Sequence, residues 1–177
     1  MTGKIIDNLG RSSGLVKEVS AGGITVADQW RLTTTYTGTA DPMTSNLEQV
    51  DTSGQGTLGT AMSESSGVFT FPSTGIYLVR FVVHFQLSGD DRDCQAFIKV
   101  TTNDSSYSRI TQNSAFIQQT SSSTTYSTNV TETLIDVTDT ANVKCSFGTQ
   151  PNNSSTGTRG ETGENRTYMT FIRLGDT

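Results

Sequence analysis

Short segments in which apolar and polar residues alternate run along most of the chain, and the clearest spans Ile76 to Leu87. Successive side chains of a β-strand point to opposite faces of the sheet, so residues of one parity share a face. The odd-numbered face of this segment is wholly apolar, and we expect it to lie in the core between two sheets. Its members are Tyr77, Val79, Phe81, Val83, Phe85 and Leu87.

The opposite face of the same segment does not have the polar character of a solvated strand. Antiparallel strands with one wet face alternate cleanly, whereas this face carries Ile, Leu and Val beside its polar residues. The closing segment, 168–174, also has large apolar residues on both faces. We therefore predict that other copies of the chain cover this outer face. The residues expected at that interface are Ile76, Leu78, Arg80, Val82, His84, Tyr168 and Ile172.

Turn-forming residues separate further strand-like segments at short intervals. These lie at 29–36, 67–71, 93–101, 106–119, 129–137 and 139–147, and we expect a long polar loop over 148–165. Eight to ten strands at this spacing indicate an all-β sandwich or barrel. Composition agrees, because Ser and Thr supply 52 of the 177 residues and the apolar set only 32%, which predicts a lean core or one shared between chains.

The first 27 residues differ from the rest and predict a separate organisation of the chain. They hold two short apolar patches, at Ile5, Ile6 and at Leu15, Val16, separated by glycine and serine. We interpret residues 1–27 as an extended N-terminal arm that docks on another protein, and residues 28–177 as a single domain.

Charge and hydropathy exclude several classes of function. The net charge of -5 gives no basic face for nucleic acid. The chain contains no run of about 18 apolar residues, so no membrane-spanning helix is predicted. The first residues lack the apolar region of a secretory signal. Two cysteines and one histidine cannot build a zinc or iron–sulfur site at this spacing. For Cys94 and Cys145 we favour reduced, buried thiols, and a single bond between them remains open.

One stretch resembles a known family. Gly67 to Val79, with the sequence GVFTFPSTGIYLV, and the following Val83-His84-Phe85 resemble the globular head of complement component one q. Val79 stands where that family usually has Phe. The segments 134–145 and 168–174 look like its late strands. The resemblance covers about 29–174 and implies a ten-stranded jelly roll close to the tumour necrosis factor fold, assembled as a homotrimer.

The chain has no collagen-like stem, and similar heads occur on bacteriophage virions. The resemblance therefore implies a non-enzymatic virion protein, as a trimeric capsid decoration or short surface appendage docked to other virion proteins by its arm. The alternative is the receptor-binding tip of a tail fibre or a lectin-like adhesin that binds a host glycan or protein. A polysaccharide hydrolase would need a pair of carboxylates in a cleft, and the acidic residues here lie mostly in turns or alone.

Few residues suggest chemistry. His84 lacks a nucleophile or elbow motif, so we interpret it as a packed interface residue; Arg80 and Arg173 are expected to pair with carboxylates, with a bound anion as the alternative. Asp90, Asp91 and Asp93 could supply oxygen ligands to calcium, although their spacing matches no EF-hand and a solvated turn is the simpler interpretation. No other cofactor is expected. Exposed loops are the predicted recognition sites, represented by Asn152, Asn153 and Arg159.

Overall fold

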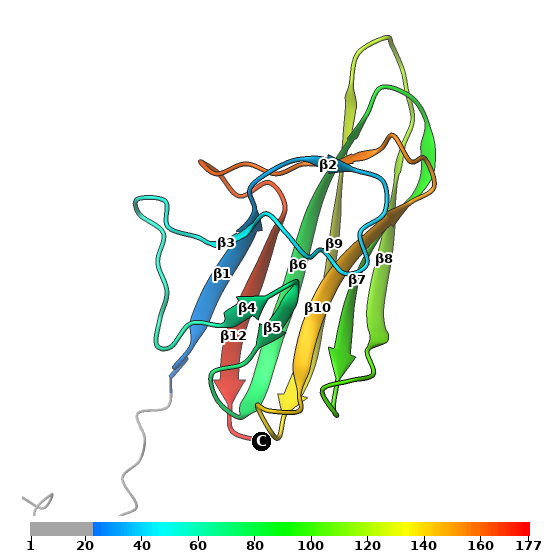
Figure 1. Cartoon of the computed structure of the whole chain (residues 1–177). Coiled ribbons are helices and arrows are strands. Elements are labelled where there is room, and N and C mark those ends of the chain that lie inside the picture. The colour runs from blue at the N-terminus through cyan, green and yellow to red at the C-terminus, as the bar shows by residue number, and fades with distance from the viewer. Residues whose placement is uncertain (1–22) are drawn as a thin grey trace, which may run out of the picture.

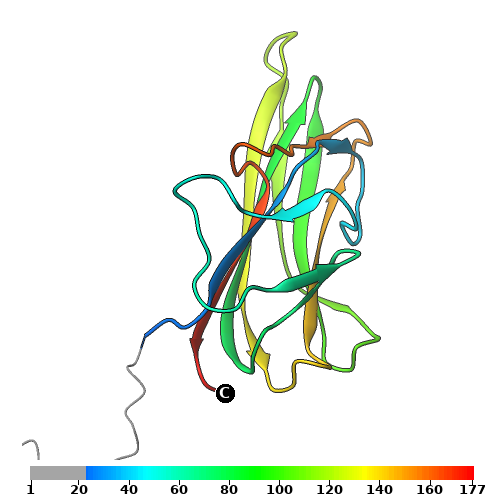
Figure 2. The same ribbon diagram turned by 60° about the vertical axis from the view of Figure 1, so that its left-hand side comes forward.

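The computed structural model describes residues 23–177, which form two antiparallel β-sheets packed face to face (Figures 1 and 2). The described residues contain no helix, and hence none long and apolar enough to cross a membrane. Two further observations bear on the N-terminal prediction. Ile5, Ile6, Leu15 and Val16 lie outside the described residues, and the sandwich begins two residues before position 28, because Val26 is buried in the core.

Sheet A has β6 as its central strand. β9 pairs with the full length of β6 on one side; β12 and then β11 pair with its other side, and β1 and β3 continue beyond β12. Its strands are β1 (Ala27–Leu32), β2 (Tyr36–Thr37), β3 (Leu47–Gln49), β6 (Gly75–Leu87), β9 (Thr125–Val137), β11 (Gly157–Thr158) and β12 (Tyr168–Gly175).

Sheet B has the strand order β4-β5-β10-β7-β8. Its strands are β4 (Ser63–Ser65), β5 (Val68–Thr70), β7 (Asp91–Thr101), β8 (Ser108–Ile117) and β10 (Lys144–Pro151). The predicted all-β class is confirmed, with one correction. The expected polar loop over 148–165 is interrupted, because β10 runs on to Pro151 and β11 follows. Polar residues there still pair, since β7 offers a partner along the whole of β10.

The core lies between the sheets and uses the predicted face of β6. All six odd-numbered side chains from Tyr77 to Leu87 are buried. Aromatic rings fill the middle: the ring centroid of Phe69 lies 5.3 Å from those of Phe147 and Phe171, and 5.4 Å from that of Trp30. The rings of Trp30 and Phe147 meet the ring of Phe69 edge to face, and such pairs stabilise a core beyond their buried area. Six of the eight phenylalanines lie in this core and compensate for a low aliphatic content.

Cys94 and Cys145 are both free and fully buried, which confirms the preferred interpretation of reduced thiols. Burial raises the pKa of the Cys94 thiol to about 12, and nearby Asp91 raises it further. Burial likewise raises the pKa of Cys145. Both thiols therefore remain protonated and act as small apolar core residues.

Two buried charged residues fix the edge of sheet A. Arg31 is 1% exposed, and its guanidinium donates to Glu48 at 2.7 Å, to Asp51 at 2.8 Å and to the hydroxyl of Thr52 at 2.6 Å. Asp28, equally buried, accepts hydrogen bonds from the indole of Trp30 and the backbone of Met62, among others. These contacts tie the turn-rich region 40–62 to β1, since each buried charge needs its partners in place.

Candidate functional site

The outer face of sheet A carries a row of aliphatic side chains. On this face Leu78 of β6 pairs directly with Leu134 of β9 on one side and with Ile172 of β12 on the other. Leu134 is 60% exposed, while Leu78 and Ile172 are half-buried. No described part of the chain lies over this row. Leu134, whose side chain is of a type usually buried, is therefore left in water.

A second apolar row crosses the same face four residues further along β6, beyond the polar pair of Arg80 and Glu132. Val82 is paired with Val130 and with Tyr168. Between the two rows lies a hollow of about 200 Å³. It is lined by Gln29, Leu78, Arg80, Glu132, Tyr168, Thr170 and Ile172. Five of the seven residues predicted at the interface therefore lie together at or beside one hollow; Ile76 and His84 lie on the same face at its lower and upper ends.

The arginines of this region have carboxylate partners. Arg80 Nε lies 3.8 Å from Glu132 Oε2, its partner across the ladder, and both side chains are about half exposed. Arg173 donates to Asp176 at 2.6 Å and to the carbonyl of Thr74 at 2.8 Å. The predicted ion pairing is confirmed for both, and the Arg80–Glu132 pair is long and exposed to solvent.

His84 is half-buried at the upper end of the face. Its ring centroid lies 5.4 Å from that of Tyr126, and it lines a second hollow of about 350 Å³ with Thr128, Glu164, Asn165 and Arg166, among others. Burial lowers the pKa of His84 and nearby Arg159 lowers it further, against an opposing effect of Glu164. The imidazole is therefore held neutral near pH 7. His84 thus lies against Tyr126 at the upper end of this face, as one of the residues that line the second hollow.

The loops at the upper end of the sandwich are joined to one another through Asp90. Its carboxylate accepts from the backbone of Gln119 at 2.7 Å, and its carbonyl accepts from the side chain of Asn153 at 3.2 Å. These contacts connect the β6–β7 turn to the loops after β8 and after β10. Figure 1 shows these loops at the end opposite residue 23 and the C-terminus. One end of the molecule therefore presents a fixed set of polar loops.

Asp91 has a structural role beneath these loops. Its side chain is buried and accepts from the hydroxyl of Thr156 at 2.5 Å and from the backbone of Asn153 at 3.1 Å. Burial by itself raises the pKa of Asp91, but hydrogen bonds from Thr156, Asn153 and Asp93 outweigh it, and the net pKa is lowered. A carboxylate that accepts several hydrogen bonds stays ionised even when buried.

The structure does not bring the three predicted calcium ligands together. Asp90 is bonded to Gln119, Asp91 to Thr156 and Asp93 to the side-chain amide of Gln95 at 2.6 Å. Within residues 23–177 no group of three or more His, Cys, Asp and Glu side chains is arranged to hold a metal ion. The acidic turn therefore works as a set of hydrogen-bond acceptors.

The three predicted recognition residues lie at the same end of the sandwich but in two places. Asn152 and Asn153 sit beside the start of β7, where the backbone of Asn152 donates to Asp93 at 3.1 Å. Arg159 instead lies over the ring of Tyr126, 4.8 Å from its centroid, at the edge of the outer face of sheet A. The Asn pair and Arg159 thus belong to different surfaces.

Sequence reasoning missed several residues of these surfaces. Leu134 and Tyr126 share the outer face of β9, and the even-numbered apolar residues of 125–137 carried the signal for them. Phe116 of β8, 68% exposed, stood in an ambiguous segment whose faces could not be assigned. A β-bulge on each strand of the β7–β8 pair shifts the register, and such shifts cannot be read from alternation.

Comparison with known proteins shows the fold. No protein-family profile and no curated protein matched the sequence. Among solved structures, the chain is similar to an Eiger TNF from S. frugiperda, with a TM-score of 0.63 at 10% identity over 88% of this chain and 96% of that one. It is also similar to murine APRIL at pH 5.0, with a TM-score of 0.58 at 11% identity over 84% and 98% of the two chains. The fold is the jelly roll of tumour necrosis factor-like proteins, as the resemblance implied.

Proposed function

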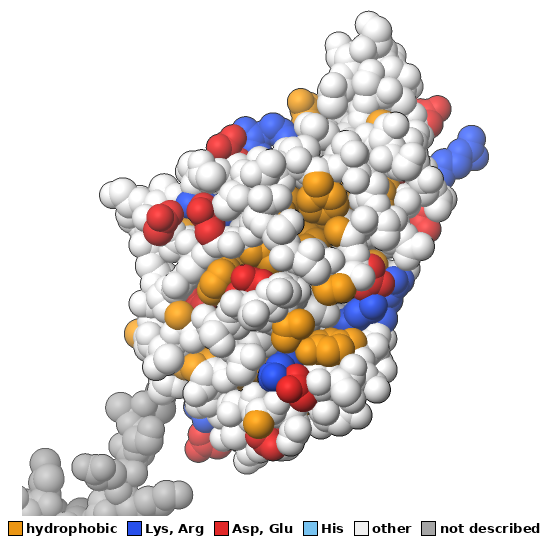
Figure 3. Space-filling view, in the orientation of Figure 1, with side chains coloured by type: hydrophobic (Ala, Val, Ile, Leu, Met, Phe, Trp, Pro, Cys, Tyr) orange, Lys and Arg blue, Asp and Glu red, His pale blue; other side chains and the backbone are white. Residues whose placement is uncertain are grey.

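We propose that the chain forms a homotrimer through the outer face of sheet A and serves as a non-enzymatic structural protein of a bacteriophage virion. The observation that carries the assembly is the uncovered apolar row of Leu78, Leu134 and Ile172 on the central sheet. Burial of apolar surface contributes about 25 cal/mol per Å², so covering this face is favourable. Figure 3 shows a different face, over β4, β5 and β10, where hydrophobic side chains form small separate groups.

Two features support the virion role. They are the Ser- and Thr-rich composition and the position of the N-terminal segment at the end of the domain opposite the polar loops. A Ser- and Thr-rich chain with a fixed sandwich and no metal-binding cluster in residues 23–177 suits a surface protein that needs stability rather than chemistry. Residues 25 and 26 lie beside Arg173, so the N-terminal segment joins the sandwich at the end away from the polar loops. An arm docked at that end would leave the loops facing outward, as in a capsid decoration or a short appendage.

The assembly is tested by light scattering of the purified chain. We expect three times the 19.0 kDa mass of one chain at micromolar concentration. The docking role is tested by deletion of residues 1–22, which leaves Val26 and β1 intact. The shortened protein is expected to remain trimeric and to be absent from particles assembled with the proteins encoded beside its gene. Normal incorporation of the shortened protein would refute the docking role, and a monomeric full-length chain would refute the assembly.

A second candidate function is attachment to a host surface, as a receptor-binding tip or a lectin-like adhesin. It is favoured by the gathering of the polar loops at one end and by their connection through Asp90. Loops held on a rigid scaffold are the usual place for recognition. This candidate shares the fold and the trimer with the first and adds a ligand.

A further inference from the structure

Two hollows adjoin at the upper end of sheet B. One has a volume of about 400 Å³ and is lined by Asp90, Asp91, Arg92, Phe116, Ile117 and Gln118. The other, of about 510 Å³, is lined by Asp90, Asp91, Arg92, Asn152, Asn153 and Ser154. Because the two share the residues from Asp90 to Arg92, they form one continuous surface around Arg92, here named the tip groove. The groove is open to solvent and belongs to neither sheet-A hollow.

Phe116 gives the tip groove an aromatic platform. It is 68% exposed, the largest exposure among the large hydrophobic side chains of the described chain, and it stands in a strand whose other exposed residues are mostly Ser, Gln and Asn. The backbone next to Phe116 is anchored, since its neighbour Ile117 pairs with Asp91 across the ladder and both are 2% exposed. An exposed phenyl ring on an anchored strand is available for stacking.

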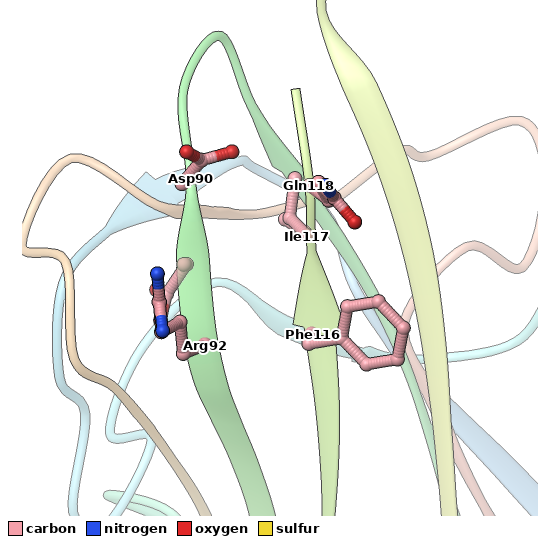
Figure 4. A pocket seen from close by; sticks show the side chains of 6 residues that line it. Asp90, Arg92, Phe116, Ile117 and Gln118 are labelled. Carbon is pink, nitrogen blue, oxygen red and sulfur yellow. The ribbon is translucent and has the colours of Figure 1, made fainter. Parts of the chain in front are cut away.

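The guanidinium of Arg92 has hydrogen-bond donors that no described residue accepts from. Residues 92 and 93 both lie opposite Phe116 because of the bulge in β7, and Arg92 is exposed. Its guanidinium makes no hydrogen bond or ion pair with any residue between 23 and 177. Figure 4 shows Arg92 beside β7 and Phe116 beside β8, with their side chains pointing away from each other, and Asp90 and Gln118 above them. A guanidinium, a carboxylate, an amide and one aromatic ring therefore line the same hollow.

We propose that the tip groove binds a neutral saccharide, an inference that rests on the second candidate function. The C–H face of a pyranose ring is weakly positive and packs on the negative face of a phenyl ring, here Phe116. Adjacent hydroxyl groups bind carboxylate, guanidinium and amide side chains, which Asp90, Arg92 and Gln118 provide. Asn152 and Asn153, predicted as recognition residues from the sequence, extend the groove towards a second sugar ring.

The chemistry of the groove favours this ligand over two others. An anionic sugar would meet the carboxylate of Asp90 in a chain of net charge -5, so the single cation Arg92 gives no net attraction. A protein partner needs an interface of about 800 Å² per side with a buried cluster of aromatic anchors. Phe116 is the only aromatic residue that lines either hollow.

The test is a nuclear magnetic resonance titration of the full-length protein. The probes are methyl glucoside, methyl galactoside, methyl mannoside and N-acetylglucosamine, with glucuronic acid as the anionic comparison. We expect at least one neutral probe to shift the amide signals of Asp90, Arg92 and residues 116–118, with a Kd on the order of 1 mM for a single ring. Phe116→Ala is expected to weaken binding about tenfold or more, and Phe116→Trp to retain it.

Ile110→Ala provides a matched control. Ile110 is an exposed apolar residue of the same strand, 46% accessible, and it lines neither hollow, so binding should be unchanged. Shifts that survive Phe116→Ala, stronger binding of glucuronic acid than of every neutral probe, or the absence of shifts with all probes would each overturn the proposal. Light scattering of the same samples reports the trimer separately, so a failed titration leaves the assembly proposal intact.

Discussion

Leu78 of β6 and Leu134 of β9 face each other directly across the antiparallel ladder on the outer side of sheet A, and no other described residue covers them. A neighbouring pair on a solvated sheet face is expected to be polar, and the next pair on this face, Arg80 and Glu132, is so. The exposed leucine pair is therefore the clearest indication that this surface is covered by a partner.

The first prediction concerns that pair. Leu134→Arg places a charge in the centre of the proposed interface, where it would be buried without a partner. We expect the trimer to dissociate into monomers with little change in the fold, because the side chain is 60% exposed in the single chain. Light scattering measures the mass, and circular dichroism checks the fold. Ile110→Arg, on sheet B, is the control; an unchanged mass for Leu134→Arg would contradict the interface.

The second prediction concerns the buried guanidinium of Arg31. Arg31→Met keeps much of the side-chain volume but leaves the carboxylates of Glu48 and Asp51 without their donor. Both carboxylates retain some contact with water, so we expect a loss of about 1–3 kcal/mol in the free energy of unfolding. Urea denaturation measures it. Arg166→Met, which removes a partly exposed ion pair with Glu164, should cost less than half as much.

The third prediction is a pH dependence that originates at Asp91. Its pKa is lower in the folded protein than in the unfolded chain, so its ionised form stabilises the fold above the ordinary pKa of 3.8. That stability should disappear as the pH falls from there through the lowered pKa. Asp91→Asn should flatten the stability profile in this acid range and lower stability at pH 7 by about 1–3 kcal/mol. Thermal unfolding from neutral to acid pH compares the two proteins; identical profiles would contradict this role.

The fourth prediction concerns close packing behind Phe97. A Cβ atom added at Gly148 would lie 2.9 Å from the carbonyl oxygen of Ala40 and closer still to the ring of Phe97. Phe97 is fully buried on the outer side of sheet B, with the guanidinium of Arg109 stacked 3.6 Å from its ring centroid. Gly148→Ala should therefore cost about 1–3 kcal/mol of stability. Gly163→Ala, which meets open space, should leave the melting temperature nearly unchanged.

Alternation along the chain determined much of the fold. The odd-numbered face of β6 lies in the core, as predicted. Alternate residues of a strand share a face, so the apolar residues of one parity identify the buried face from the local sequence alone. The unusual character of the other face was visible for the same reason. The short strands β2, β3, β4 and β11 were not predicted, since segments of two or three residues carry no periodicity and form only where a neighbouring strand offers hydrogen-bond partners.

Only the tertiary structure decided which distant residues meet. Asp91 and Thr156 are 65 positions apart, and their hydrogen bond exists because β7 and β10 are adjacent in sheet B. Phe116 and Arg92 flank one groove because a bulge shifts the β7–β8 register, which alternation cannot reveal. The sequence by itself determined which faces are apolar. The pairing of strands, fixed by backbone hydrogen bonds between segments remote in the chain, decided where those faces lie and which side chains share a site.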